Sequence, residues 1–216
     1  MPSEPSLKRT IAFVDGQNLY HAVRESFGYT YPNYDVVALS QAMCRKMGWE
    51  LIQVRFYTGV PDKNDDLFWH AFWEAKLQTM RWQKVQVYSR PLRYRNRLVK
   101  LPDGTEHSFL AGEEKGVDVR IALDIIRMAH RKEWDVALVF SQDQDLSEVA
   151  SEIRTIAQEQ GRWIKMACAF PLSPTTRNRR GIDQTDWIII DRTTYDACID
   201  RRNYRPRPSD PGDRKA

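Results

Sequence analysis

Hydrophobic residues along this chain occur in two patterns: short continuous runs, and longer stretches in which every third or fourth residue is apolar. Short runs are typical of buried strands, and the longer spacing is typical of amphipathic helices. Strands are therefore predicted over residues 10–14, 51–57, 85–88, 135–140 and 163–170. Helices are predicted over residues 17–27, 35–47, 65–81, 117–131 and 146–160. Because strands and helices alternate over short connections, we expect one α/β domain, a three-layer α/β/α sandwich with a mostly parallel central sheet.

Capping residues and one aromatic stripe refine this pattern. Asp35 is expected to cap the helix that follows it, and Gly28 and Gly48 are expected to end helices. Large apolar residues recur at helical spacing within residues 65–81, which favours a place in the core; they are Phe68, Trp69, Phe72, Trp73 and Leu77. The loop over residues 29–34 carries three tyrosines, for which stacking on nucleic-acid bases and packing against the core both stay open.

Acidic residues follow two of the predicted strands closely. Asp15 comes directly after the first apolar run, and Asp143 and Asp145 come shortly after the fourth. Asp118 lies in the first turn of a predicted helix, where the helix dipole favours a negative charge. Ligands of open α/β sheets bind at the carboxyl edge of the strands, so these acids are expected to share one site.

Two further acids are expected to be structural. Asp124 lies on the same predicted helix as Asp118 but roughly 240° around its axis at 100° per residue, so the two carboxylates cannot easily bind one ion. Asp186 stands immediately before the apolar stretch 187–190, and we favour a structural role for it as well.

Composition is ordinary for a soluble globular protein: 216 residues, 42% hydrophobic and 29% charged. The first residues lack the apolar segment of a signal peptide, and no apolar run is long enough to span a bilayer, so a cytoplasmic protein is expected. Cys44, Cys168 and Cys198 are too few and too widely spaced for a disulfide framework or a zinc site. We expect a folded domain over residues 9–200, flanked by a disordered N-terminus, 1–8, and a disordered basic tail, 201–216.

Basic residues concentrate in two segments. Residues 81–100 carry seven Lys and Arg and no acid, and residues 201–216 carry six against two acids. Bases interleave with apolar residues before Pro102-Asp103-Gly104, and Asp-Gly between two short runs is a hairpin signal. We therefore expect a basic β-hairpin that grips a sugar-phosphate backbone, with a merely solvated charged ribbon as the open alternative. The candidate nucleic-acid-binding residues are Arg90, Arg93, Tyr94, Arg95, Arg97, Lys100, Lys115, Arg177, Arg179 and Arg180.

Three motifs resemble, in order and spacing, those of the NYN domain family, also called LabA-like proteins, a branch of the PIN-like metal-dependent ribonucleases. They are Val14-Asp15-Gly16-Gln17-Asn18-Leu19, Glu114-Lys115-Gly116-Val117-Asp118 followed by Asp124, and Ser141-Gln142-Asp143-Gln144-Asp145-Leu146. The resemblance runs from about Arg9 to about Ile199. It implies a PIN-like fold in which the five predicted strands take the order 3-2-1-4-5. It also implies RNA as substrate and, as in many PIN-like nucleases, a homodimer, for which residues 65–81 would supply an interface.

The acids and the resemblance together point to phosphodiester hydrolysis with Mg²⁺ or Mn²⁺. Carboxylates are hard ligands that suit these ions, whereas zinc prefers Cys and His sets, and the four histidines show no such spacing. The predicted metal ligands are Asp15, Asp118, Asp143 and Asp145, the last serving alternatively as general base. Asn18 is expected to orient water or phosphate, and Glu114 or Lys115 to support the ligands.

Other activities are disfavoured, and one alternative stays open. A haloacid-dehalogenase-type phosphatase needs a second Asp where Gln17 stands, and no glycine-rich nucleotide-binding motif occurs. A non-catalytic RNA-binding or scaffold protein on the same fold remains the rival to a nuclease. Many relatives carry glycine beside the first acid of the third motif, whereas this chain has Gln142 before that acid and Gln144 after it. Gln142 and Gln144 are expected to narrow the pocket or to contact substrate.

Overall fold

The computed structural model describes residues 2–100 and 105–206. Its elements in chain order are β1 (Arg9–Asp15), α1 (Gly16–Phe27), α2 (Val36–Met47), β2 (Glu50–Val60), α3 (Leu67–Trp82), β3 (Gln86–Pro91), β4 (Arg93–Lys100), β5 (Glu106–Glu113), α4 (Val117–His130), β6 (Val136–Phe140), the 3-10 helix η1 (Gln144–Leu146), α5 (Ser147–Glu159), β7 (Lys165–Pro171), β8 (Asp186–Ile190) and α6 (Arg192–Asp196).

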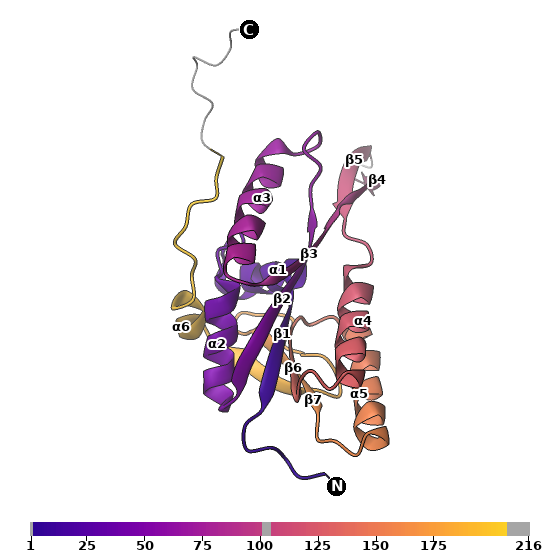
Figure 1. Cartoon of the computed structure of the whole chain (residues 1–216). Coiled ribbons are helices and arrows are strands. Elements are labelled where there is room, and N and C mark those ends of the chain that lie inside the picture. Colours follow the sequence, from indigo (N-terminus) through magenta and orange to yellow (C-terminus); the bar gives the residue numbers. More distant parts are fainter. Residues whose placement is uncertain (1, 101–104, 207–216) are drawn as a thin grey trace.

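Six strands form the central sheet in the order β3-β2-β1-β6-β7-β8, and every neighbouring pair is parallel (Figure 1). The first five agree with the order 3-2-1-4-5 implied by the resemblance. The sixth, β8, was expected only as an apolar stretch, and it becomes a strand by pairing with β7. The predicted α/β class and parallel sheet are confirmed.

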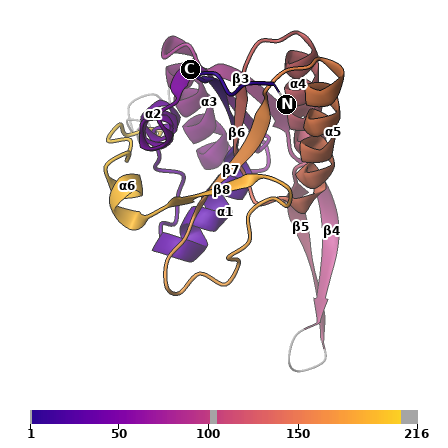
Figure 2. The ribbon, with the colours of Figure 1, turned by 90° about the horizontal axis from the view of Figure 1, so that it is seen from below.

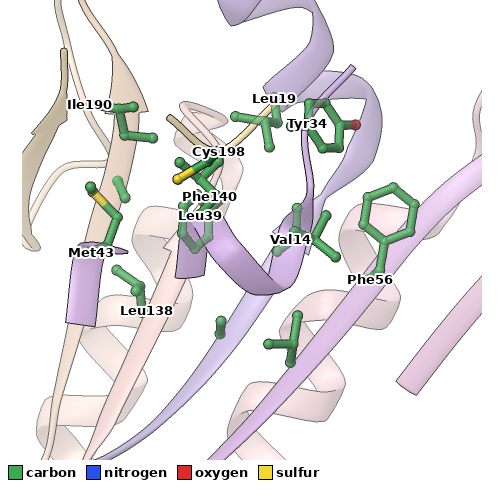
Figure 3. Packing of buried hydrophobic residues seen from close by; sticks show 14 of the residues in the cluster. Val14, Leu19, Tyr34, Leu39, Met43, Phe56, Leu138, Phe140, Ile190 and Cys198 are labelled. Carbon is green, nitrogen blue, oxygen red and sulfur yellow. The ribbon is translucent and has the colours of Figure 1, made fainter. Parts of the chain in front are cut away.

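Helices cover both faces of the sheet, which gives three layers (Figure 1). One buried cluster joins the sheet to α1, α2, α3 and α6, and Figure 3 shows Val14 and Phe140 of the sheet beside Leu39 and Met43 of α2. A second cluster joins the other face to α4 and α5. Alternate residues of β1 enter opposite clusters, which is the arrangement that a continuous apolar run predicts for a central parallel strand.

The predicted helix ends are confirmed. Asp35 caps α2, since its side chain accepts hydrogen bonds from the backbone N–H groups of Val37 and Ala38. Gly28 and Gly48 end α1 and α2 in the left-handed conformation.

The aromatic stripe of α3 belongs to the core over only part of its length. Phe72, Trp73 and Leu77 are buried, whereas Trp69 is half-buried and Phe68 is 44% exposed. The prediction that the whole stripe is core was therefore wrong at its N-terminal end, because the first turns of α3 extend past the edge of the sheet (Figure 1).

Strands β4 and β5 pair antiparallel in a separate two-stranded ribbon that projects from the body of the molecule (Figure 2). This is the predicted basic β-hairpin; its predicted turn, Pro102-Asp103-Gly104, lies outside the described residues.

The packed chain continues beyond the predicted domain end at residue 200. Tyr204 is buried: its hydroxyl donates to the Asp200 carboxylate (2.6 Å), and its ring centroid lies 5.8 Å from that of Phe72. Residues 207–216 of the predicted tail lie outside the described residues. All three cysteines are buried free thiols. Within the described residues, no helix combines the length and apolarity needed to cross a bilayer.

Candidate metal centre

The carboxyl end of β1 places Asp15 at the centre of the site. Asp15 is 7% exposed and caps α1, because its Oδ1 accepts a hydrogen bond from the Asn18 N–H (3.0 Å). Its Oδ2 accepts a second hydrogen bond, from the hydroxyl of Ser141 (3.3 Å). Ser141 directly follows the neighbouring strand β6. The strand pairing therefore fixes this carboxylate against the third motif.

Four carboxylates from separate segments line one pocket beside α4. They are Asp15, Glu114, Asp118 and Asp143, and Lys115, Gly116 and Val119 complete the lining. Asp118 lies in the first turn of α4, a helix whose N-terminus has no side-chain cap. Three of the four predicted ligands thus come together.

Asp145 is placed differently. It is exposed, lies in η1 and does not line this pocket. Its backbone N–H donates to Asp143 Oδ1 (3.0 Å), so the main chain of Asp145 helps to hold Asp143 in place.

Crowded negative charge perturbs two of these acids. Burial, together with the charges of Asp143 and Asp118, raises the pKa of Asp15 to about 6 despite the bonds from Asn18 and Ser141. Burial and the charges of Asp15 and Asp118 raise the pKa of Glu114 to about 8. Neither Asp15 nor Glu114 forms an ion pair within the described part of the chain, so their charges lack a compensating protein cation.

The chemistry of this donor set fits a divalent cation of the Mg²⁺ or Mn²⁺ type. All four side chains offer hard oxygen donors, and a bound cation would favour the charged form of Asp15 and Glu114, whose pKa values are raised first by burial and then by the neighbouring acids. Across residues 2–100 and 105–206, no three His, Cys, Asp or Glu side chains already converge closely enough to enclose an ion.

Glu114 lies closer to Asp15 than a supporting residue needs to. It was expected to support the ligands, yet it lines the pocket beside Asp15. Its carboxylate accepts a hydrogen bond from the backbone N–H of Gly59 in β2, and that contact directs the side chain. The acid-rich approach to α4 was the available signal.

Asn18 and the two glutamines of the third motif hold the site together. Asn18 Oδ1 accepts a hydrogen bond from the Gln142 N–H (2.8 Å), which ties α1 to the loop after β6. The Gln142 amide donates to the carbonyls of Asn178 (3.1 Å) and Arg180 (2.9 Å). Gln144 donates to the Gly181 carbonyl (2.8 Å), so both glutamines anchor the basic segment that precedes β8.

The candidate RNA-binding residues lie on two sides of the acidic pocket. Lys115 lines it and is exposed. Arg90, near the end of β3, packs against Gly116, since a Cβ added at Gly116 would lie 2.9 Å from Arg90 Nη1. On the ribbon, Arg93 and Arg95 are exposed.

The remaining candidates differ in how freely they are presented. The Tyr94 hydroxyl accepts a hydrogen bond from the Asp62 N–H (3.3 Å), so it is tied to the turn before α3. The side chains of Arg97 and Lys100 lie outside the described residues. Arg177, Arg179 and Arg180 are exposed on the segment held by the glutamines, and Arg180 pairs with Asp183 (2.5 Å).

Asp124 and Asp186 lie away from the acidic pocket. Asp124 is 1% exposed, and its carboxylate accepts hydrogen bonds from Arg55 (2.9 Å) and the Tyr57 hydroxyl (2.9 Å). Asp186 is the first residue of β8, so it lies at the amino end of the parallel strands, whereas Asp15 lies at their carboxyl end. The Asp186 carboxylate pairs with Lys165 (2.5 Å). Both placements agree with the structural roles expected for them.

Comparison with known proteins places this geometry in a family. The model of the NYN domain matches residues 9–162. The crystal structure of VPA0982, a protein of unknown function from Vibrio parahaemolyticus, is similar over 88% of this chain and 98% of that chain, with 20% identity and a TM-score of 0.51. MurG from Acinetobacter baumannii is similar over 84% of this chain and 45% of that chain, with 11% identity and a TM-score of 0.32, too low to indicate a shared fold. No curated protein matches.

The fold is therefore the nuclease-like one that the motifs predict. The NYN domain model matches well over half of the length of this chain, and the chain therefore belongs to the NYN domain family.

Proposed function

We propose that this protein is a metal-dependent ribonuclease that hydrolyses RNA phosphodiester bonds at the acidic pocket. The observation that supports this proposal is the gathering of Asp15, Glu114, Asp118 and Asp143 from three separate segments in one pocket, where two pKa values are raised. Uncompensated carboxylates are costly to a folded protein, and they are typical of sites that bind a cation.

The roles follow from the surroundings of each residue. Asp15, Glu114, Asp118 and Asp143 would hold Mg²⁺ or Mn²⁺, and we now count Glu114 among the ligands. When bound, such an ion lowers the pKa of a water molecule and offsets the negative charge of the reacting phosphate. We assign the exposed Asp145 the role of accepting a proton from water. Asn18 acts as a positioning residue, since its side-chain oxygen is bonded to the Gln142 N–H.

Exposed bases near the pocket would bind the RNA backbone. Lys115 stands at the pocket, Arg93 and Arg95 lie on the ribbon, and the arginines of 177–180 lie on the segment next to Gln142. Contacts of Lys and Arg with phosphates release counterions, so the affinity is expected to fall steeply as salt is raised.

The test is a cleavage assay on labelled RNA and single-stranded DNA with Mn²⁺, Mg²⁺ or EDTA. We expect the wild type to cleave RNA with either metal and EDTA to stop it. Asp15→Asn and Asp143→Asn should lose cleavage, whereas Asp65→Asn, a change at an exposed residue outside the pocket, should retain it. Wild-type activity in Asp15→Asn, or undiminished cleavage in EDTA, would refute the assignment.

A non-catalytic RNA-binding protein is the second candidate. It is favoured by the absence, within the described part of the chain, of three converging metal-ligating side chains. On this alternative the wild type binds RNA with the same affinity with and without divalent metal, and it cleaves neither RNA nor DNA.

A further inference from the structure

A second pocket, of different chemistry, opens next to the acidic one. Its walls include Gln17, Tyr20 and His21 of α1, Trp69 and Trp73 of α3, and Leu92 between β3 and β4. None of the residues described as lining it is Asp, Glu, Lys or Arg. The acidic pocket therefore has a largely aromatic neighbour that the proposed reaction does not use.

The two pockets share a wall at Gly59. The Gly59 N–H donates to the Glu114 carboxylate, which lines the acidic pocket. A Cβ added at Gly59 would lie 2.4 Å from Leu92 Cδ2 and 3.3 Å from Gln17 Nε2, which line the aromatic pocket, and 2.9 Å from Glu114 Oε2. Gly16, which also lines the aromatic pocket, directly follows Asp15. The two pockets thus adjoin each other at Gly59, where the Glu114 carboxylate lies beside Leu92 and Gln17.

The aromatic walls are held in place before any ligand binds. The Tyr20 hydroxyl donates to the Thr30 carbonyl (3.0 Å). The Trp69 ring packs edge-to-face against Phe72, with ring centroids 5.1 Å apart. Burial, together with the charge of Arg24, lowers the pKa of His21, which favours the uncharged form of this ring. Fixed, uncharged rings suit a flat, neutral, aromatic ligand.

Gln17 adds a polar group to this apolar surface. Its side-chain amide makes no hydrogen bond among those found in the described part of the chain, and it offers both a donor and an acceptor. Such an amide can pair with the edge of a nucleobase whose face lies against the aromatic rings.

We propose that the aromatic pocket binds one unpaired nucleobase of the nucleic acid whose phosphate lies at the acidic pocket. This inference rests on the proposed function, because it takes the acidic pocket as the place of the phosphate. A base inside a duplex is stacked on its neighbours and paired with its partner, so it cannot enter the aromatic pocket without leaving the helix. The preferred substrate is therefore single-stranded or looped RNA.

Binding measured without cleavage tests this inference directly. The full chain is titrated, in EDTA, into a labelled single-stranded RNA octamer and into an abasic sugar-phosphate octamer of equal length. We expect the wild type to prefer the base-bearing octamer. Trp69→Ala should weaken binding of that octamer by about tenfold, since stacking contributes about 1–3 kcal/mol per base, and should leave the abasic octamer unaffected.

Trp82→Ala is the matched control, because Trp82 ends the same helix, is 75% exposed and does not line the pocket. If thermal unfolding shows that Trp69→Ala is poorly folded, Gln17→Ala, a change at a half-buried helix residue, replaces it with the same expected direction.

The inference is overturned if the wild type binds the two octamers with equal affinity. It is also overturned if Trp69→Ala loses the same amount of affinity for both octamers. The cleavage assay is read separately. If the protein cleaves RNA but binds the two octamers equally, base binding in the aromatic pocket is rejected and the proposed ribonuclease activity is retained. If it prefers the base-bearing octamer but cleaves no RNA, base binding is supported and the proposed hydrolysis is rejected.

Discussion

At the scale of single residues, two acids on α4 have opposite surroundings. Asp124 is buried, and Arg55, Arg120 and Arg127 all lie within 3.1 Å of its carboxylate. Burial alone would raise its pKa, but the ion pair with Arg120, the hydrogen bond from the Tyr57 hydroxyl and the charge of Arg55 keep the pKa below its usual value. Asp118 stands in the first turn, facing the acidic pocket. We infer that Asp124 stabilises the fold and that Asp118 serves the reaction.

Substitution by Asn separates these two roles. Asp124→Asn should lower the free energy of unfolding by about 3 kcal/mol, because the buried Asp124 carboxylate is the shared counterion of three arginines, of which Arg55 is the most buried. Asp118→Asn should change stability little in EDTA and should remove metal-dependent cleavage. Urea denaturation and the RNA assay, carried out on both variants, check the pair. Equal loss of stability in both, or full activity in Asp118→Asn, would contradict it.

Glu114 is a residue that costs stability in the metal-free protein. Its pKa is about 8 in the folded chain against an ordinary value of 4.5, so between those pH values the folded state holds a proton that the unfolded state has released. Stability therefore falls as pH rises through this window. Glu114→Gln cannot ionise, and it keeps an acceptor for the Gly59 N–H.

We expect Glu114→Gln to raise the free energy of unfolding at pH 8.5 in EDTA by on the order of 4–5 kcal/mol, with the gain vanishing near pH 4.5. Chemical denaturation at several pH values measures this. Glu74→Gln, a change at an exposed residue of α3, should show no such pH-dependent gain. A gain that is constant across pH would disprove the electrostatic cause.

At the scale of elements, the sequence predicts best what local patterns decide. The apolar runs of β1 and β6 and the caps of α2 appear where expected, because burial on both faces and local hydrogen bonds determine them. The strand β8 was missed because its short apolar run becomes a strand only through pairing with β7. The direction of the Glu114 side chain could not be predicted, because it depends on a hydrogen bond from Gly59, distant in sequence. Long-range contacts of this kind leave no local pattern.

The glutamines of the third motif show the same limit. They were expected to narrow the pocket or to contact substrate, and this stays a prediction; what the sequence did not indicate is that their amides hold the segment 178–183. Gln142→Ala and Gln144→Ala together should free this segment to open locally, because four hydrogen bonds to it are lost. Trypsin should then cleave faster after Arg179 and Arg180, as mass spectrometry of the fragments would show. Gln158→Ala, on the exposed face of α5, is the control and should digest like the wild type.

At the scale of the whole molecule, a buried lysine ties the C-terminal segment to the body. Lys76 of α3 is 1% exposed, and its ammonium donates to the Tyr34 carbonyl (3.0 Å) and pairs with Asp200 (3.3 Å). Tyr204 covers this pair, with its ring centroid 4.8 Å from Lys76 Nζ. The Tyr34 hydroxyl in turn donates to the Gly16 carbonyl beside Asp15 (2.9 Å). The end of the domain is therefore connected, through a buried charge, to the start of α1.

A double-mutant cycle measures what this buried pair contributes. Asp200→Asn should lower the free energy of unfolding by about 3 kcal/mol, because a desolvated ammonium then lacks its counterion. Adding Lys76→Met removes that ammonium, so the double variant should be more stable than Asp200→Asn alone, which makes the two changes strongly non-additive. Urea denaturation of the four proteins gives the coupling energy, with Arg201→Gln, a change at an exposed neighbour, as control. Additive losses would mean that Tyr204 and the other contacts hold the C-terminal segment without the ion pair, and the buried charge would then have no part in joining it to the body.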